Sequence, residues 1–247
     1  MIVKKRLLIL GGTTEATQLA TQAAEIPNLE VISSLAGRTQ QPINPTGTVR
    51  SGGFGGVEGL INYLQAQQID LLIDATHPFA AQISWNAAMA VDRISIPKLS
   101  IVRPAWQSEP NWIEVESNEA AAAILPDLAQ RIFLTIGRQE LATFAHLRQL
   151  WFLMRMIDPP ADTAQIPSGE ILLARAPFSV EQERSWMQNY EIQAIVSKNS
   201  GGDATVSKLI AARELKLPVV MVQRPLMPNG ETVSDVRSAL SWITQQF

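Results

Sequence analysis

Short apolar runs and longer amphipathic stretches alternate along the chain. The apolar runs predict strands at 6–10, 29–35, 48–50, 70–75, 97–102, 131–136, 151–156, 171–174, 193–196 and 218–222. Amphipathic stretches between them predict helices near 14–25, 56–67, 79–92, 118–129, 139–149, 180–189, 204–215 and 234–246. This alternation is typical of an α/β fold with mostly parallel sheets and helices on both faces.

The number of predicted strands is large for a single sheet. The segment 106–112, WQSEPNW, is polar and contains proline, as a linker does. The sequence therefore predicts two α/β domains, residues 1–107 and residues 108–247, with a C-terminal helix that can pack back on the rest.

Composition restricts the classes of function. The chain has 247 residues, of which 46% are hydrophobic and 17% charged, as in globular proteins. It has no cysteine, which excludes disulfides and thiolate catalysis, and its two histidines predict no metal site. The net charge of -3 gives no attraction to nucleic acid or to a membrane. Because the first apolar run stops at Gly11, too early for a signal peptide, we expect a cytoplasmic protein.

Cations follow many of the predicted strands. In open parallel sheets this edge forms the ligand crevice, and guanidinium groups pair well with carboxylates and phosphates. The pattern predicts a ligand with several negative charges, in a crevice between the two domains. For any single arginine, an ordinary surface salt bridge is the alternative. The residues are Arg38, Arg50, Arg103, Arg138, Arg155, Arg175, Lys198 and Arg224.

The segment 7–16, LLILGGTTEA, has the pattern of a strand, a tight turn and a helix. Gly11 and Gly12 allow the backbone to approach a ligand, and Thr13 or Thr14 can cap a helix whose free N–H groups attract phosphate. The pattern G-x-G-x-x-G is not matched, so a plain glycine turn is the alternative.

The segment 33–38, SSLAGR, follows the second predicted strand. NAD sites usually have an acidic residue there for the ribose hydroxyls, and this strand end has none. Ser33, Ser34 and Arg38 instead suit a 2′-phosphate. If a dinucleotide binds, the sequence thus favours NADPH over NADH.

Two further segments of the first half carry candidate residues. The loop 50–56, RSGGFGG, predicts backbone close to a ligand or a mobile flap, and a loose turn is the alternative. In 73–80, IDATHPFA, a buried strand ends in Asp74, Thr76 and His77. His77 is a candidate proton donor or hydrogen-bond partner, with a structural role as the alternative.

The segment 197–202, SKNSGG, follows an apolar run in the second half. It places a cation, an amide, hydroxyls and flexible backbone at one predicted strand end, which suits a polyanionic ligand. An ordinary loop is the alternative. Motifs of short-chain dehydrogenases, P-loop proteins and α/β-hydrolases are absent from the sequence.

Seven motifs together resemble the precorrin-6A reductase family, including its cobalt-precorrin-6A form, over essentially the whole chain. They are GGTTEA, AGR, DATHPFA, IGRQEL, IDPP, SKNSGG and LPVVMVQRP, in that order. The resemblance implies two Rossmann-like domains, the first for the dinucleotide and the second for the substrate, with the active site in the cleft. It also implies reduction of one double bond of a polycarboxylate tetrapyrrole by a reduced nicotinamide cofactor during cobalamin synthesis.

The resemblance also implies roles for individual residues. Lys198 and His77 are the catalytic candidates. The cofactor-binding candidates are Gly11, Gly12, Thr13, Glu15, Arg38, Gly53, Phe54, Gly55, Thr76, His77, Asn199, Ser200, Gly201 and Gly202. The crevice cations Arg103, Arg138, Arg155, Arg175, Lys198 and Arg224 are the candidates for binding the substrate carboxylates, and no metal is expected.

Two other functions are compatible with the same residues. One is an NAD(P)H-dependent reductase of a different polyanionic substrate, and the other is a tetrapyrrole- or nucleotide-binding protein without catalysis. The sequence leaves open whether the macrocycle holds cobalt and whether the protein is a monomer or a homodimer.

Overall fold

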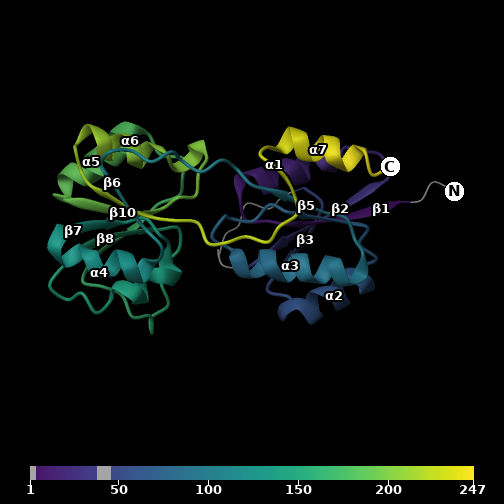
Figure 1. Cartoon of the computed structure of the whole chain (residues 1–247), viewed down its shortest axis with the longest axis horizontal. Helices are drawn as coiled ribbons and strands as arrows, with labels where there is room; N and C mark the ends of the chain where they lie inside the picture. Colours follow the sequence, from purple (N-terminus) through teal and green to yellow (C-terminus); the bar gives the residue numbers. More distant parts are fainter. Residues whose placement is uncertain (1–3, 38–45) are drawn as a thin grey trace. The chain divides into compact units, whose positions relative to one another are not determined.

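The chain folds into two compact units, each with its own parallel sheet (Figure 1). A computed structural model describes residues 4–37 and 46–247. Unit 1 comprises Met1–Pro104 and Pro225–Phe247, and unit 2 comprises Ala105–Arg224.

The sheet of unit 1 has the strand order β3-β2-β1-β4-β5-β12, and every pairing in it is parallel. The chain order reverses between β1 and β4. Helices α1 and α7 cover one face, and α2 and α3 the other (Figure 1). The elements are β1 (Lys5–Leu10), α1 (Thr14–Ala23), β2 (Leu29–Leu35), β3 (Thr48–Ser51), α2 (Gly56–Ala66), β4 (Leu71–Asp74), α3 (Ala81–Ile94), β5 (Lys98–Ile101), β12 (Glu231–Val233) and α7 (Val236–Thr244).

The central strand β1 explains why its sequence is a continuous apolar run. Leu7 and Ile9 pack in the core under α1 and α7, whereas Leu8 and Leu10 pack in the core under α2 and α3. All four side chains are at most 2% exposed. A strand that is covered on both faces needs apolar residues at every position rather than at alternate ones.

The sheet of unit 2 has the order β6-β11-β10-β7-β8-β9 and is also parallel throughout. Its chain order reverses between β7 and β10. Helices α5 and α6 lie on one face, and α4 lies on the other (Figure 1). The elements are β6 (Trp112–Val115), α4 (Asn118–Leu128), β7 (Arg131–Leu134), η1 (Arg138–Phe144), β8 (Trp151–Met156), β9 (Gly169–Leu173), α5 (Val180–Asn189), β10 (Ala194–Lys198), η2 (Asp203–Thr205), α6 (Ser207–Glu214) and β11 (Val219–Val222).

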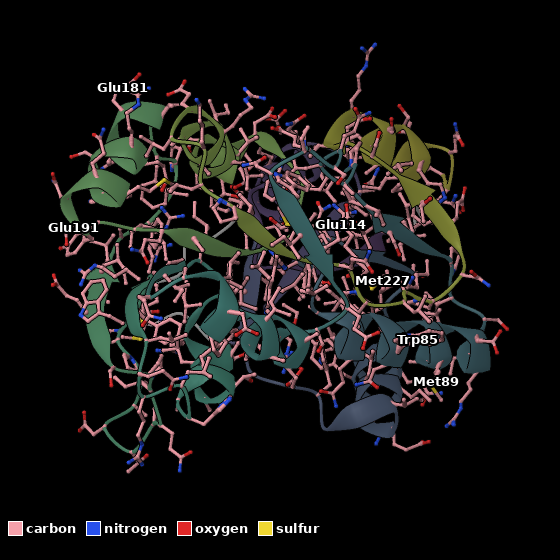
Figure 2. The ribbon with its side chains drawn as sticks, turned by 60° about the vertical axis from the view of Figure 1, so that its left-hand side comes forward. Trp85, Met89, Glu114, Glu181, Glu191 and Met227 are labelled. Carbon is pink, nitrogen blue, oxygen red and sulfur yellow. The ribbon has the colours of Figure 1, made fainter. Side chains whose placement is uncertain are left out.

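The predicted fold class is confirmed, but the predicted division at 107/108 differs from the two units. The segment after Arg224 belongs to unit 1, because β12 pairs with β5 and α7 contacts α1. Trp85 of α3 also donates its indole N–H to the carbonyl of Leu226 (3.1 Å). Figure 2 labels Trp85 on α3 and Met227 on this returning segment.

Two strands were not predicted, and one predicted helix has a different form. β6 and β12 are edge strands with mostly exposed or half-buried residues, so neither has the apolar run that marks a central strand. The predicted helix 139–149 is the 3-10 helix η1 followed by turns. The buried residues Leu141 and Phe144 of η1, and Leu147 and Leu150 in the turns after it, recur every third position, which is the repeat of a 3-10 helix rather than of an α-helix.

The packing of α7 on the first sheet gives a stability prediction. Ile243 is fully buried in the core under α1 and α7. We expect Ile243→Ala to lower the free energy of unfolding by about 2–5 kcal/mol, because it leaves a cavity in that core. Urea unfolding would measure this, with the exposed Gln245→Ala as the control. Equal, small losses for both variants would contradict the packing of α7.

Candidate functional site

The end of β1 presents backbone and a helix N-terminus at the point where the strand order reverses. Gly12 has φ +112°, a conformation that favours glycine. Thr13 caps α1 as predicted, because its Oγ1 accepts from the N–H of Ala16 (3.1 Å). The same hydroxyl donates to the carbonyl of Ala75 (2.7 Å), after β4. Thr13 therefore ties the two strand ends that flank the reversal.

The end of β4 forms a tight polar turn. The buried carboxylate of Asp74 accepts from both the N–H and the hydroxyl of Thr76, at 3.1 and 2.7 Å. His77 is exposed, and its Nδ1 accepts from the N–H of Phe79 (3.2 Å). This contact requires an unprotonated Nδ1, so a neutral imidazole that makes it carries its proton on Nε2. His77 can thus donate a hydrogen bond through Nε2.

A very small cleft, with a volume of about 10 Å³, lies at this reversal point of unit 1. It contains Glu15 and Arg103, where Nη1 of Arg103 lies 3.0 and 3.2 Å from the two carboxylate oxygens of Glu15. The charge of Glu15 at the first turn of α1 is thereby neutralised, so it does not repel an anion there. The cleft is lined by Thr13, Glu15, Ala75, Thr76, Pro78, Ile101 and Arg103.

The glycine-rich segment 52–56 follows β3 and ends at the first residue of α2. Gly52, Gly55 and Gly56 all have positive φ, between +81° and +107°. The guanidinium of Arg50 stacks on the ring of Phe54, with 3.9 Å between Cζ and the ring centroid. Phe54 itself packs edge-on against Tyr63 of α2. The loop is therefore held against α2 rather than loose.

The reversal point of unit 2 lies between the ends of β7 and β10, and it carries Lys198. The Lys198 ammonium donates to Glu140 of η1 (3.1 Å) and its side chain is 13% exposed. Glu140 also accepts from the amide of Asn118 on α4. Lys198 is thus held in position by residues from two further elements.

Trp106 braces the loop that follows Lys198. The side-chain amide of Asn199 both accepts from the N–H of Trp106 (2.9 Å) and donates to its carbonyl (3.1 Å). The indole N–H of Trp106 donates to the carbonyl of Gly202 (3.0 Å), and the ammonium of Lys208 lies over the ring. The segment predicted as a linker is therefore part of the support for this loop.

Arg224 braces the same loop from the end of β11. Its guanidinium donates to the carbonyls of Asn199 (2.8 Å) and Ser200 (3.1 Å). Gly201 and Gly202 have positive φ, which lets the backbone turn after these contacts. In the structure, Asn199 and Arg224 thus hold the loop in shape, while Ser200 is buried within it.

The remaining predicted substrate arginines of unit 2 have different surroundings. Arg138 is half-buried and donates to the carbonyl of Pro159 (3.0 Å), and Arg175 is exposed after β9. Arg155 is 8% exposed and forms an ion pair with the fully buried Glu183 (2.7 Å). Burial lowers the pKa of Arg155, and the Glu183 carboxylate opposes that shift. The buried position of Arg155 argues against contact with a substrate.

The predicted candidates thus gather at two strand edges, one in each unit. In unit 1 these are Gly11–Thr13, Glu15, Gly53–Gly55, Thr76, His77 and Arg103, and in unit 2 Arg138, Arg175, Lys198–Gly202 and Arg224. Arg38 lies outside the described residues. Sequence reasoning missed the supporting roles of Trp106 and Glu140. The available signal for Trp106 was a tryptophan in an otherwise polar segment. The signal for Glu140 was an acidic residue two positions after Arg138.

Within residues 4–37 and 46–247, no helix is long and apolar enough to cross a membrane. The same residues contain no group of three or more histidine or acidic side chains that could hold a metal ion.

Comparison with known proteins identifies close relatives. Residues 6–244 match the family described as "Precorrin-6x reductase CbiJ/CobK". A precorrin-6A reductase from Rhodococcus erythropolis is 51% identical over 96% of this chain and 97% of its own length. A cobalt-precorrin-6A reductase from Priestia megaterium is 25% identical over 97% of this chain and 98% of its own length. The solved structure "CobK precorrin-6A reductase" superposes with a TM-score of 0.91 at 39% identity, covering 98% of this chain and 96% of that chain.

The buried pair of Arg155 and Glu183 gives a prediction that separates stability from substrate binding. We expect Arg155→Met to lower the free energy of unfolding by about 3–5 kcal/mol, because Glu183 would stay buried without its partner. The double variant Arg155→Met/Glu183→Leu should recover most of that loss. Chemical denaturation would measure both. A stable Arg155→Met variant with a raised KM for the macrocycle would contradict the structural role.

Proposed function

The chain belongs to the precorrin-6x reductase family, and from this premise we propose that it transfers a hydride from NADPH to a double bond of precorrin-6A. The product belongs to cobalamin biosynthesis. The observation that carries the proposal is the 51% identity to a precorrin-6A reductase over nearly the full length of both chains.

The same comparison supports one form of the substrate over the other. A relative named for the cobalt-free macrocycle is 51% identical, whereas one named for the cobalt-containing macrocycle is 25% identical over a similar share of the chain. We therefore favour the cobalt-free macrocycle as the substrate.

Several features of unit 1 fit a dinucleotide. Its strand order is that of a dinucleotide-binding sheet, in which the pyrophosphate lies at the reversal point beside the first helix N-terminus. Gly11 and Gly12 would allow close approach of the pyrophosphate, and the neutralised Glu15 would not oppose it. Ser33, Ser34 and Arg38 would favour the 2′-phosphate of NADPH.

The reduction adds a hydride to one carbon of the double bond and a proton to the other. When bound, the reduced nicotinamide supplies the hydride. In unit 1, the Nε2–H of His77 could donate a hydrogen bond. Only the imidazolium form of His77, in which Nδ1 no longer accepts from Phe79, could donate a proton. In unit 2, the Lys198 ammonium could stabilise negative charge on the macrocycle, and Glu140 would hold it in place. Arg138 and Arg175 would pair with substrate carboxylates.

Two alternatives share the same residues. A reductase of another polyanionic substrate would oxidise NADPH only with that substrate, and a non-catalytic binding protein would bind without oxidising it. Both predict no reaction with precorrin-6A.

A substrate comparison tests the proposal. Absorbance at the reduced-nicotinamide band would follow NADPH after addition of precorrin-6A, and separately of cobalt-precorrin-6A. We expect rapid oxidation with precorrin-6A and a much slower reaction with the cobalt form. Clear NADPH binding without oxidation by either macrocycle would refute the reductase assignment. A faster reaction with the cobalt form would refute only the choice of substrate.

Replacement of Lys198 tests its role in the chemical step. We expect Lys198→Ala to lower kcat by about 10²-fold or more, because the positive charge proposed to stabilise the macrocycle is lost. NADPH affinity, measured by fluorescence titration, should change little. Lys216→Ala is the matched control, since Lys216 is an exposed lysine shortly before β11, at the opposite edge of the same sheet. Unchanged turnover in Lys198→Ala would remove Lys198 from the site.

A further inference from the structure

Arg50 lies at the end of β3, directly beside the end of β2. The parallel register pairs Arg50 with Ser34. In dinucleotide-binding sheets the adenosine ribose lies at the end of the second strand, where an acidic residue binds the hydroxyls of NAD or an arginine binds the 2′-phosphate of NADP. Arg50 therefore lies at the position where NAD and NADP are distinguished in such sheets.

The contacts of Arg50 hold its guanidinium in one orientation. Its Nη1 donates to the hydroxyl of Ser34 (2.8 Å), and its Nη2 donates to the carbonyl of Gly53 (3.0 Å). One face of the group packs on Phe54. A side chain fixed in this way loses little conformational entropy when it binds a ligand.

The charge of Arg50 is not neutralised by the residues that the structure describes. Its contacts there are with a hydroxyl, a carbonyl and two aromatic rings, and none of the ion pairs among those residues includes it. Two of the five N–H donors of an arginine are used in these bonds. The Ser34 hydroxyl accepts from Arg50, so its own proton can be donated to another acceptor.

We infer that Arg50 and Ser34 bind the 2′-phosphate and make the protein specific for NADPH. The inference rests on the proposed function, because it assigns a residue to the cofactor of that reaction. The alternative is that Arg50 only anchors the glycine-rich loop. An anchor would affect NADPH and NADH equally, whereas a phosphate ligand would affect NADPH selectively.

A pair of nucleotide fragments tests this without the macrocycle. Adenosine 2′,5′-bisphosphate and adenosine 5′-monophosphate differ only in the 2′-phosphate, and calorimetric titration measures the affinity of each. In Arg50→Gln we expect the affinity for the bisphosphate to fall by roughly 10- to 100-fold, the effect of losing charge-assisted hydrogen bonds. Affinity for the monophosphate should stay within about twofold. KM for NADPH should rise similarly in the reductase assay, with KM for NADH unchanged.

Two further variants complete the design. Arg93→Gln is the control, since Arg93 is an exposed arginine of the same unit that pairs with Glu58. Arg50→Lys keeps the charge but lacks the paired N–H donors of the guanidinium, so its affinity for the bisphosphate should lie between those of wild type and Arg50→Gln. It replaces Arg50→Gln if that variant fails to fold.

Equal losses for the two fragments would overturn the inference in favour of the loop anchor. Selectivity that persists in the Arg50 variants but is lost in Arg38→Gln would also overturn it. In both cases NADPH-dependent reduction by the wild type would leave the proposed function standing. A wild type that reduces precorrin-6A with no preference for the 2′-phosphate overturns the inference alone, whereas one that binds no nucleotide overturns both.

Discussion

Parallel hydrogen bonding of β1 with β4, and of β7 with β10, is the constraint on which both units depend. Because parallel strands all end at the same edge, every loop that follows a strand of one sheet reaches that edge. Where the strand order reverses, the two neighbouring loops turn to opposite faces and leave room between them. The glycine turn after β1, the Asp74 turn and the Lys198 loop all lie at such points. Their positions thus follow from strand pairing, and in unit 1 the bond from Thr13 to the carbonyl of Ala75 reinforces it.

The hydrogen bonds and ion pairs of each cation at a strand end determine whether its charge is available to a ligand. Arg103 is held by Glu15, Arg155 by Glu183 and Lys198 by Glu140, so part of each of these charges is balanced internally. Arg224 donates to loop carbonyls and fixes backbone shape. A count of cations along an edge therefore overstates the charge available to a ligand. The internal partner of each cation shows whether its charge is available.

The central strands and the reversal-point loops could be predicted from the sequence, because doubly covered strands read as apolar runs and the loops carry glycine, threonine or lysine directly after them. The edge strands β6 and β12 could not, since residues exposed to solvent are under no such requirement. The burial of Arg155 could not be predicted from the sequence either, because its partner Glu183 belongs to α5, a helix of mostly polar sequence. The bracing by Trp106 joins residues far apart along the chain, and no local pattern encodes such a contact.

Unit 1 is formed by two separate segments of the chain, and this affects the order in which the two units can fold during synthesis. All of unit 2 emerges from the ribosome before β12 and α7 do. Until then β5 is a bare sheet edge, and the apolar surface of α1 that α7 later covers faces water. Unit 2, a continuous segment, can complete its sheet first, although its residues come later than most of unit 1. The nascent chain thus closes the sheet of unit 1 last, and a premature stop near the end would damage unit 1 rather than unit 2.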